Sequence, residues 1–103
     1  MNMNLNVHSI HFDADAKLEH FIREKLDKLN QFHDRIIDGQ VFLRLEHDGE
    51  NRENKVVEVR MNIPGKELFA KRQSRSFEEA ADHAAEALRR QLLRAKPRLR
   101  KAS

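Results

Sequence analysis

Hydrophobic and polar positions follow two different periods in the first third of the chain. Residues 3–7 alternate between apolar and polar side chains, and this period of two predicts a strand with one solvated face. Over residues 16–32 the apolar residues recur at spacings of three and four, which predicts an amphipathic helix. Asp13 and Asp15 precede that helix, where a carboxylate can accept a hydrogen bond from a free backbone amide.

The middle of the chain returns to a period of two. Residues 41–45 and 57–63 each alternate cleanly, and the polar, glycine-containing residues 48–54 between them predict a hairpin loop. Pro64-Gly65 predicts a tight turn. A shorter fourth strand is expected over about residues 67–72.

Helical spacing resumes near the C-terminal end. Ser74 or Ser76 can cap this second helix, and Pro97 is expected to end it. Its predicted buried positions are Phe77, Ala80, Ala81, Ala84, Leu88, Leu92 and Ala95.

The resulting order, β-α-β-β-β-α, predicts an α+β fold. Its four-stranded sheet should be antiparallel at the hairpins, with two helices packed on one face, as in double-stranded-RNA-binding domains. The chain of 103 residues is long enough for one domain, expected over residues 1–97, with a basic tail at 98–103. No apolar run approaches the roughly 20 residues that span a bilayer, and no secretory signal is recognisable. We therefore expect a cytoplasmic protein.

Charge is concentrated at one end of the chain. Residues 1–60 carry nine Lys and Arg against twelve Asp and Glu, whereas residues 87–103 contain seven basic residues and no acidic one. Such a patch attracts polyanions. Nucleic acid is favoured over a membrane, because this segment has little beyond Leu99 to insert among lipids.

Lys25 and Lys28 are the candidate binding residues of the first helix. Lys25 falls about 20° from the middle of the apolar stripe, so its ammonium must either extend past the core to solvent or lie in the seam beside the second helix. Lys28 lies on the edge of the same stripe.

On the second helix, basic residues flank the apolar stripe. Arg90 and Arg94 share one flank, and Arg89 and Lys96 share the other. Both flanks are expected to reach the groove between the helices, with Asp82 and Glu86 on the outer face. The alternative is that these cations only complement the helix dipole, but its reach is short compared with seven basic residues.

Catalytic and cofactor chemistry finds little support. The chain lacks cysteine, a glycine-rich phosphate loop and a nucleophile elbow, so we expect neither an enzyme nor a cofactor. Six histidines show no convergent metal-ligand spacing. Tryptophan and tyrosine are absent, and all six phenylalanines can be placed near the core or at strand ends. Contacts to phosphates are therefore favoured over stacking on bases.

Three segments resemble one known family. Residues 24–29 read Glu-Lys-Leu-Asp-Lys-Leu, similar to a Glu-Lys-Leu-x-Lys-Leu motif, and residues 32–36 resemble an aromatic-x-Asp-Arg-Ile segment. Residues 77–96 resemble an aromatic-x-x-Ala-x-Asp stretch followed by Leu-x-Arg-Gln-Leu-x-Lys-x-Lys. These are motifs of the ribosome hibernation-promoting factors, also called ribosome-associated inhibitor A or sigma-54 modulation proteins.

The resemblance implies a non-enzymatic protein that binds the small ribosomal subunit in the channel of messenger and transfer RNA. Its helices would lie on ribosomal RNA and block translation by steric occlusion in idle cells. The free chain is expected to be monomeric, with no membrane and no small-molecule substrate as partner. The residues predicted to bind ribosomal RNA are Lys25, Lys28, Arg89, Arg90, Arg94, Lys96, Arg98, Arg100 and Lys101.

Two alternatives remain open. One is a general module for structured RNA, suggested by the similar arrangement of helices and sheet in double-stranded-RNA-binding domains. The other is a protein-interaction modulator of a sigma factor, suggested by the family's older name.

Overall fold

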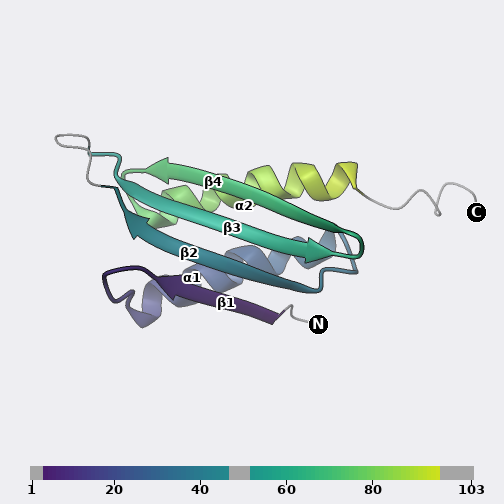
Figure 1. Ribbon diagram of the computed structural model, residues 1–103, viewed down its shortest axis with the longest axis horizontal. Coiled ribbons are helices and arrows are strands. Elements are labelled where there is room, and N and C mark those ends of the chain that lie inside the picture. Colours follow the sequence, from purple (N-terminus) through teal and green to yellow (C-terminus); the bar gives the residue numbers. More distant parts are fainter. Residues whose placement is uncertain (1–3, 47–51, 96–103) are drawn as a thin grey trace, which may run out of the picture.

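A four-stranded sheet with both helices on one face makes up the fold (Figure 1). The computed structural model describes residues 4–46 and 52–95. The elements are β1 (Asn4–Ser9), α1 (Ala16–Asp27), the 3₁₀ turn η1 (Lys28–Gln31), β2 (Asp38–Leu45), β3 (Lys55–Ile63), β4 (Lys66–Ser74) and α2 (Phe77–Arg94). The predicted α+β class and element order are confirmed. The likeness to double-stranded-RNA-binding domains stays a prediction, as does the division into residues 1–97 and 98–103.

The strands lie in the order β1-β2-β3-β4. Both hairpins, β2–β3 and β3–β4, are antiparallel as predicted, whereas β1 pairs with β2 in parallel. Parallel neighbours need a crossover, and α1 provides it. Because β1 and β4 are the outer strands, the last strand of the chain presents a free edge beside α2.

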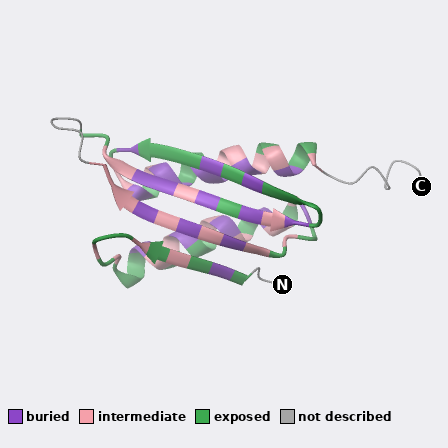
Figure 2. Cartoon of the chain, viewed as in Figure 1, coloured by how far each residue is buried: buried purple, intermediate pink, exposed green. Residues whose placement is uncertain are grey.

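Burial alternates along β2 and β3, as the period of two predicts (Figure 2). Val41 pairs with Val59, which in turn pairs with Ala70, so these three side chains form one row on the helix-covered face. Ile22 of α1 and Leu88 of α2 are fully buried against this face. Burying one such aliphatic side chain stabilises the fold by roughly 1.5–3 kcal/mol.

Both helices begin at a capped residue. The Asp15 carboxylate accepts a hydrogen bond from the Leu18 amide at 2.8 Å, and the Ser76 hydroxyl accepts one from the Glu79 amide at 3.0 Å. Of the serines that the sequence offered, Ser76 is therefore the cap of α2. Such caps contribute about 1 kcal/mol each.

The first helix is shorter than its apolar pattern predicts. The pattern predicts one helix over residues 16–32, but α1 ends at Asp27 and η1 follows. The Asn30 side-chain amide donates to the Asp27 carbonyl at 3.0 Å, and the Phe32 amide donates to the Leu29 carbonyl at 3.0 Å. These bonds span three residues, so they tighten the last turn and change the direction in which later side chains point.

The strand ends also differ from the pattern. β2 begins at Asp38 and β4 extends over Lys66–Ser74, so both are longer than predicted. The predicted turn at Pro64-Gly65 is confirmed, and Gly65 adopts a φ of 77°, a conformation that favours glycine. The predicted hairpin loop at residues 48–54 lies partly outside the described residues.

Candidate nucleic-acid interface

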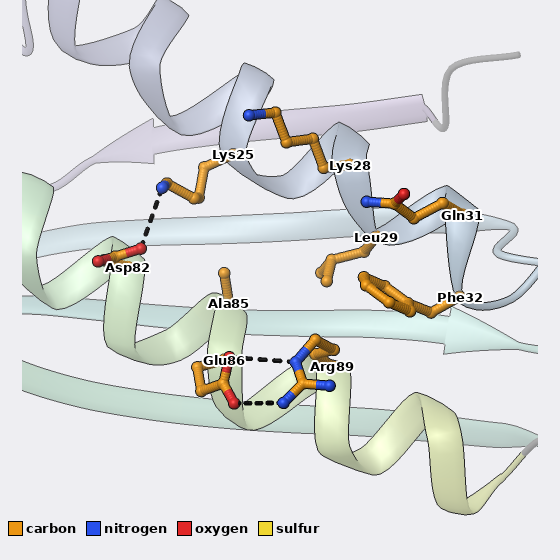
Figure 3. A pocket seen from close by; sticks show the side chains of 9 residues that line it. All are labelled: Lys25, Lys28, Leu29, Gln31, Phe32, Asp82, Ala85, Glu86 and Arg89. Atoms are coloured by element: carbon orange, nitrogen blue, oxygen red, sulfur yellow. Dashed lines mark hydrogen bonds and ion pairs between the residues drawn. The ribbon is translucent and has the colours of Figure 1, made fainter.

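The groove between the two helices contains an open hollow of about 170 Å³ (Figure 3). Cationic and aromatic side chains from the first helical segment face α2 across it, and α2 contributes one arginine and two carboxylates. The principal residues are Lys25, Lys28, Phe32, Asp82, Glu86 and Arg89. The structure thus brings together three of the predicted RNA-binding cations: Lys25, Lys28 and Arg89.

Lys25 crosses the seam between the helices. Its Nζ lies 3.0 Å from Asp82 Oδ1 and 5.4 Å from the centroid of the Phe21 ring. The apolar stripe allowed the Lys25 ammonium either to extend past the core to solvent or to lie in the seam beside the second helix, and the structure shows it in the seam. The Lys25 side chain is 31% exposed and that of Asp82 is 61% exposed, so water screens the pair and its contribution to stability is at most about 1 kcal/mol.

Arg89 is held by two hydrogen bonds from its guanidinium to Glu86. Nε lies 3.1 Å from Oε1, and Nη2 lies 2.6 Å from Oε2. The Arg89 hydrogen bond is the main cause that holds the pKa of Glu86 below its ordinary value, and the charges of Arg89 and Arg90 act in the same direction. The same hydrogen bond raises the pKa of Arg89. The Arg89 guanidinium also lies 5.8 Å from the Phe32 ring centroid, within the range of a cation–π interaction.

The Asp82 and Glu86 side chains are 61% and 45% exposed, which agrees with the predicted outer face, but their contacts in the groove were not predicted. Both carboxylates line the groove and contact its cations. The physical reason is that α1 packs against α2, which brings these carboxylates within reach of the cations that line the groove. The groove is therefore a mixed surface in which Lys25 and Arg89 each have both an acidic partner and an aromatic neighbour.

Arg90 lies on the other flank of α2, away from α1. It lines a second hollow of about 200 Å³ together with Arg72 of β4 and His83 of α2. The expectation that both flanks of α2 reach the groove between the helices is thus wrong for Arg90, because β4 lies beside that flank. Its Nε remains 3.5 Å from Glu86.

The other predicted cations lie toward the end of the chain. Arg94 is exposed at the last residue of α2. Four more predicted residues lie outside the described residues: Lys96, Arg98, Arg100 and Lys101. Their role stays a prediction.

Two features were not predicted from the sequence. Arg72 is two residues after Ala70 and four after Leu68, a spacing that places all three on the face toward the helices. The spacing could have indicated this position, but the strand was expected to end at Arg72. Phe69 is neither near the core nor at a strand end: it lies in the middle of β4, is 45% exposed, and has the Arg60 guanidinium 5.6 Å from its ring centroid. The placement of all phenylalanines near the core or at strand ends is therefore wrong.

Within residues 4–46 and 52–95, no three His, Asp or Glu side chains gather closely enough to hold a metal ion. No helix in this part of the chain has both the length and the apolar character needed to cross a membrane.

Comparison with known proteins agrees with the motifs in the two helices. The family described as sigma 54 modulation protein / S30EA ribosomal protein matches residues 5–100. The chain belongs to this family. The resemblance drawn from residues 24–29, 32–36 and 77–96 is thereby confirmed for the S30EA family.

Two relatives match most of this chain. A ribosome hibernation promotion factor of Deinococcus radiodurans is 32% identical over 89 residues, which are 86% of this chain and 47% of that protein. The chain thus spans about half the length of this relative. A ribosome hibernation promoting factor of Pseudomonas putida is 29% identical over 90 residues, 87% of this chain and 83% of that protein.

Solved structures share the fold. The N-terminal domain of Thermus thermophilus Protein Y aligns with this chain at a TM-score of 0.78 and 19% identity. The alignment covers 93% of this chain and 100% of the Protein Y chain. A ribosomal subunit interface protein from Coxiella burnetii aligns with a TM-score of 0.79 at 19% identity, covering 90% and 97%. At these identities the likeness establishes the architecture, namely the sheet with two helices side by side.

Proposed function

We propose that this chain is a ribosome hibernation factor. It binds the small ribosomal subunit through ribosomal RNA in the channel of messenger and transfer RNA, and it blocks translation by occupying that channel. Membership of the S30EA family and the names of the relatives support a role at the ribosome. The free chain acts as a monomer, without catalysis, in the cytoplasm.

The observation that carries the proposal is the convergence of Lys25, Lys28 and Arg89 in one groove. Ammonium and guanidinium groups at the surface bind phosphate oxygens of an RNA backbone, and these contacts fix the orientation of the protein on the RNA. Glu86 occupies Nε and one N–H of Nη2 of Arg89, and the remaining N–H groups on Nη1 and Nη2 can donate to the oxygens of a phosphate. Beyond Arg94 the sequence adds Lys96, Arg98, Arg100 and Lys101, whose side chains would supply further phosphate contacts.

Phosphate contacts make binding depend on salt, because each neutralised phosphate releases counterions. The protein should therefore sediment with purified ribosomes at low salt and dissociate steeply as salt rises. In a cell-free translation reaction, it should lower the yield in proportion to the fraction of ribosomes bound. A protein that stays at the top of the gradient at low salt would refute the proposed function.

Reversing the groove charge provides a sharper test. The double variant Lys28→Glu with Arg89→Glu should abolish co-sedimentation and keep the wild-type circular dichroism spectrum. The control Lys66→Glu with Arg75→Glu makes the same change in net charge at exposed positions outside the groove, and it should still bind. Equal loss in both variants would mean that net charge, not the groove, determines binding.

Free duplex RNA separates this function from a general RNA-binding module. A dedicated channel binder stays on ribosomes when excess duplex RNA is added, whereas a module that recognises RNA helices is displaced. Displacement at modest RNA excess would favour the general module.

A further inference from the structure

A second cationic hollow lies on the flank of α2 that faces β4. It has a volume of about 200 Å³ and is lined by Arg72, His83, Glu86, Ala87 and Arg90. The groove between the helices lies on the opposite flank of the same helix. Glu86 lines both hollows, so α2 carries one basic surface on each side of this carboxylate.

The local structure explains why these side chains converge. In β4, Arg72 pairs with Val57, a core residue, so it projects to the helix-covered face. Its neighbour Lys71 pairs with Glu58 and projects to the opposite face of the sheet. On α2, His83 and Arg90 are seven residues apart, two helical turns, so they lie on one side of the helix, toward β4.

The hollow keeps donors available for an anion. The Arg72 Nη1 donates to the Lys71 carbonyl at 2.8 Å, which positions the guanidinium and leaves its other N–H groups to bind. Among residues 4–46 and 52–95, the one ion-pair partner of Arg90 is Glu86, at 3.5 Å. His83 adds a ring nitrogen that donates when it carries a proton.

Glu86 is the one carboxylate among the residues that line this hollow, and its negative charge repels an anion there. Its oxygens already accept two hydrogen bonds from Arg89, on the groove side. Glu86 thus pairs with two guanidinium groups, those of Arg89 and Arg90, and Arg72 adds a third guanidinium to the lining of the hollow. The surroundings remain cationic after the existing ion pairs are formed, as a phosphate site requires.

We propose that Arg72, His83 and Arg90 form a second site for a backbone phosphate of RNA, so that α2 sits between two phosphate contacts. This inference deepens the proposed function and rests on it. The ligand is a phosphodiester group of the RNA that the groove binds. Glu86 couples the two sites, because it holds Arg89 on one side and Arg90 on the other.

The salt dependence of ribosome binding tests this site. Arg72→Gln should lower the slope of log affinity against log salt by about 0.7–0.9, the value for one lost phosphate contact, and weaken binding roughly tenfold at low salt. Lys71→Gln is the matched control: it removes the same charge from the adjacent residue, on the other face of the sheet. This control should keep the wild-type slope. Circular dichroism would verify that both variants fold.

The outcomes separate the second site from the function. If the wild-type protein does not bind ribosomes, the proposed function fails and the second site fails with it. If the wild-type protein binds but the two variants have equal slopes, only the second site is overturned. A titration of the protein with inorganic phosphate alone, followed by NMR, tests the nature of the ligand. Phosphate could cause chemical-shift changes that Arg72→Gln abolishes, while the same variant binds ribosomes as the wild type does. That result would mean a site for free phosphate and would overturn the assignment to RNA.

Discussion

Asp82 Oδ1 lies 3.0 Å from Lys25 Nζ, so an ion pair joins α1 and α2 across the groove proposed to hold RNA (Figure 3). The carboxylate holds the ammonium in the seam before any RNA arrives. It also repels phosphate and must give up its partner when a phosphate binds Lys25. The pair therefore orients a residue proposed to bind RNA, and it should lower the affinity of the groove for polyanions in general.

Replacing this carboxylate should strengthen RNA binding. Asp82→Asn removes the repulsion, and we expect affinity for ribosomes to rise several-fold at low salt while unfolding free energy falls by no more than about 1 kcal/mol, the worth of an exposed pair. Affinity for unrelated duplex RNA should rise as well. Equilibrium sedimentation and urea unfolding measure the two effects.

Glu78→Gln is the control for this variant, because Glu78 is exposed in the first turn of α2 and does not line the groove. It makes the same change in net charge and should bind as the wild type does. If Asp82→Asn instead weakens binding, the main role of Asp82 is to position Lys25.

Local patterns were sufficient to predict much of the fold. Alternation around Val59 and helical spacing around Leu88 reflect burial on one face, which depends only on neighbouring positions along the chain. The parallel pairing of β1 with β2 was not evident, because the partner of an edge strand depends on the path of the whole chain. At the end of α1, the Asn30 side chain donates to the Asp27 carbonyl and η1 begins, a change that the apolar spacing does not encode.

The candidate site was predictable in part for a similar reason. The position of Lys25 near the middle of an apolar stripe indicated a special environment, and the structure places it in the seam. The partners of Arg89 and Arg90 could not be assigned, because the sequence does not reveal that α1 lies on one flank of α2 and β4 on the other. Adjacent residues on a helix point about 100° apart, so these two arginines reach different hollows.

A buried position of α2 should be far more sensitive than an exposed one. Leu88 is fully buried between α2 and the sheet, whereas Leu93 is 41% exposed on the same helix. Leu88→Ala should lower the unfolding free energy by about 2–5 kcal/mol, because it removes apolar contacts and leaves a cavity. Leu93→Ala, the same chemical change, should cost less than about 1 kcal/mol. Comparable losses in urea unfolding would contradict the packing of α2 against the sheet.

Gln91 protects the free edge of the sheet. Its Nε2 donates to the Phe69 carbonyl at 2.8 Å, and its Oε1 accepts from the Phe69 amide at 3.4 Å. Gln91→Ala should expose both groups of β4, lower stability by roughly 0.5–1.5 kcal/mol, and promote pairing of edges between molecules. Sedimentation velocity should show self-association that grows with concentration, unlike for Gln31→Ala at an exposed residue of η1. A variant that stays monomeric would show that the edge is protected by other means.

Acid should destabilise the fold through Glu58 on the uncovered face of the sheet. Burial raises the pKa of this carboxyl, but hydrogen bonds and charge from Arg44 and Arg60 outweigh burial and hold the pKa below its ordinary value of 4.5. Arg44 Nη1 lies 3.0 Å from Oε1, Arg60 Nη2 lies 3.3 Å from Oε2, and the third cation facing the carboxyl is Lys71, from β4. The unfolded chain thus binds a proton at higher pH than the folded one, so this stabilisation is present above pH 4.5 and is lost as the pH falls through the folded-state pKa.

For the variant Glu58→Gln, the free energy of unfolding should therefore decrease less steeply between about pH 5 and pH 3 than it does for the wild type. At neutral pH the variant should be less stable than the wild type. Urea unfolding at a series of pH values measures both quantities. Glu67→Gln removes an exposed carboxyl from the same face of the sheet and is the matched control. Identical slopes for Glu58→Gln and the wild type would mean that the two arginines do not stabilise the charged form of Glu58 in the folded protein.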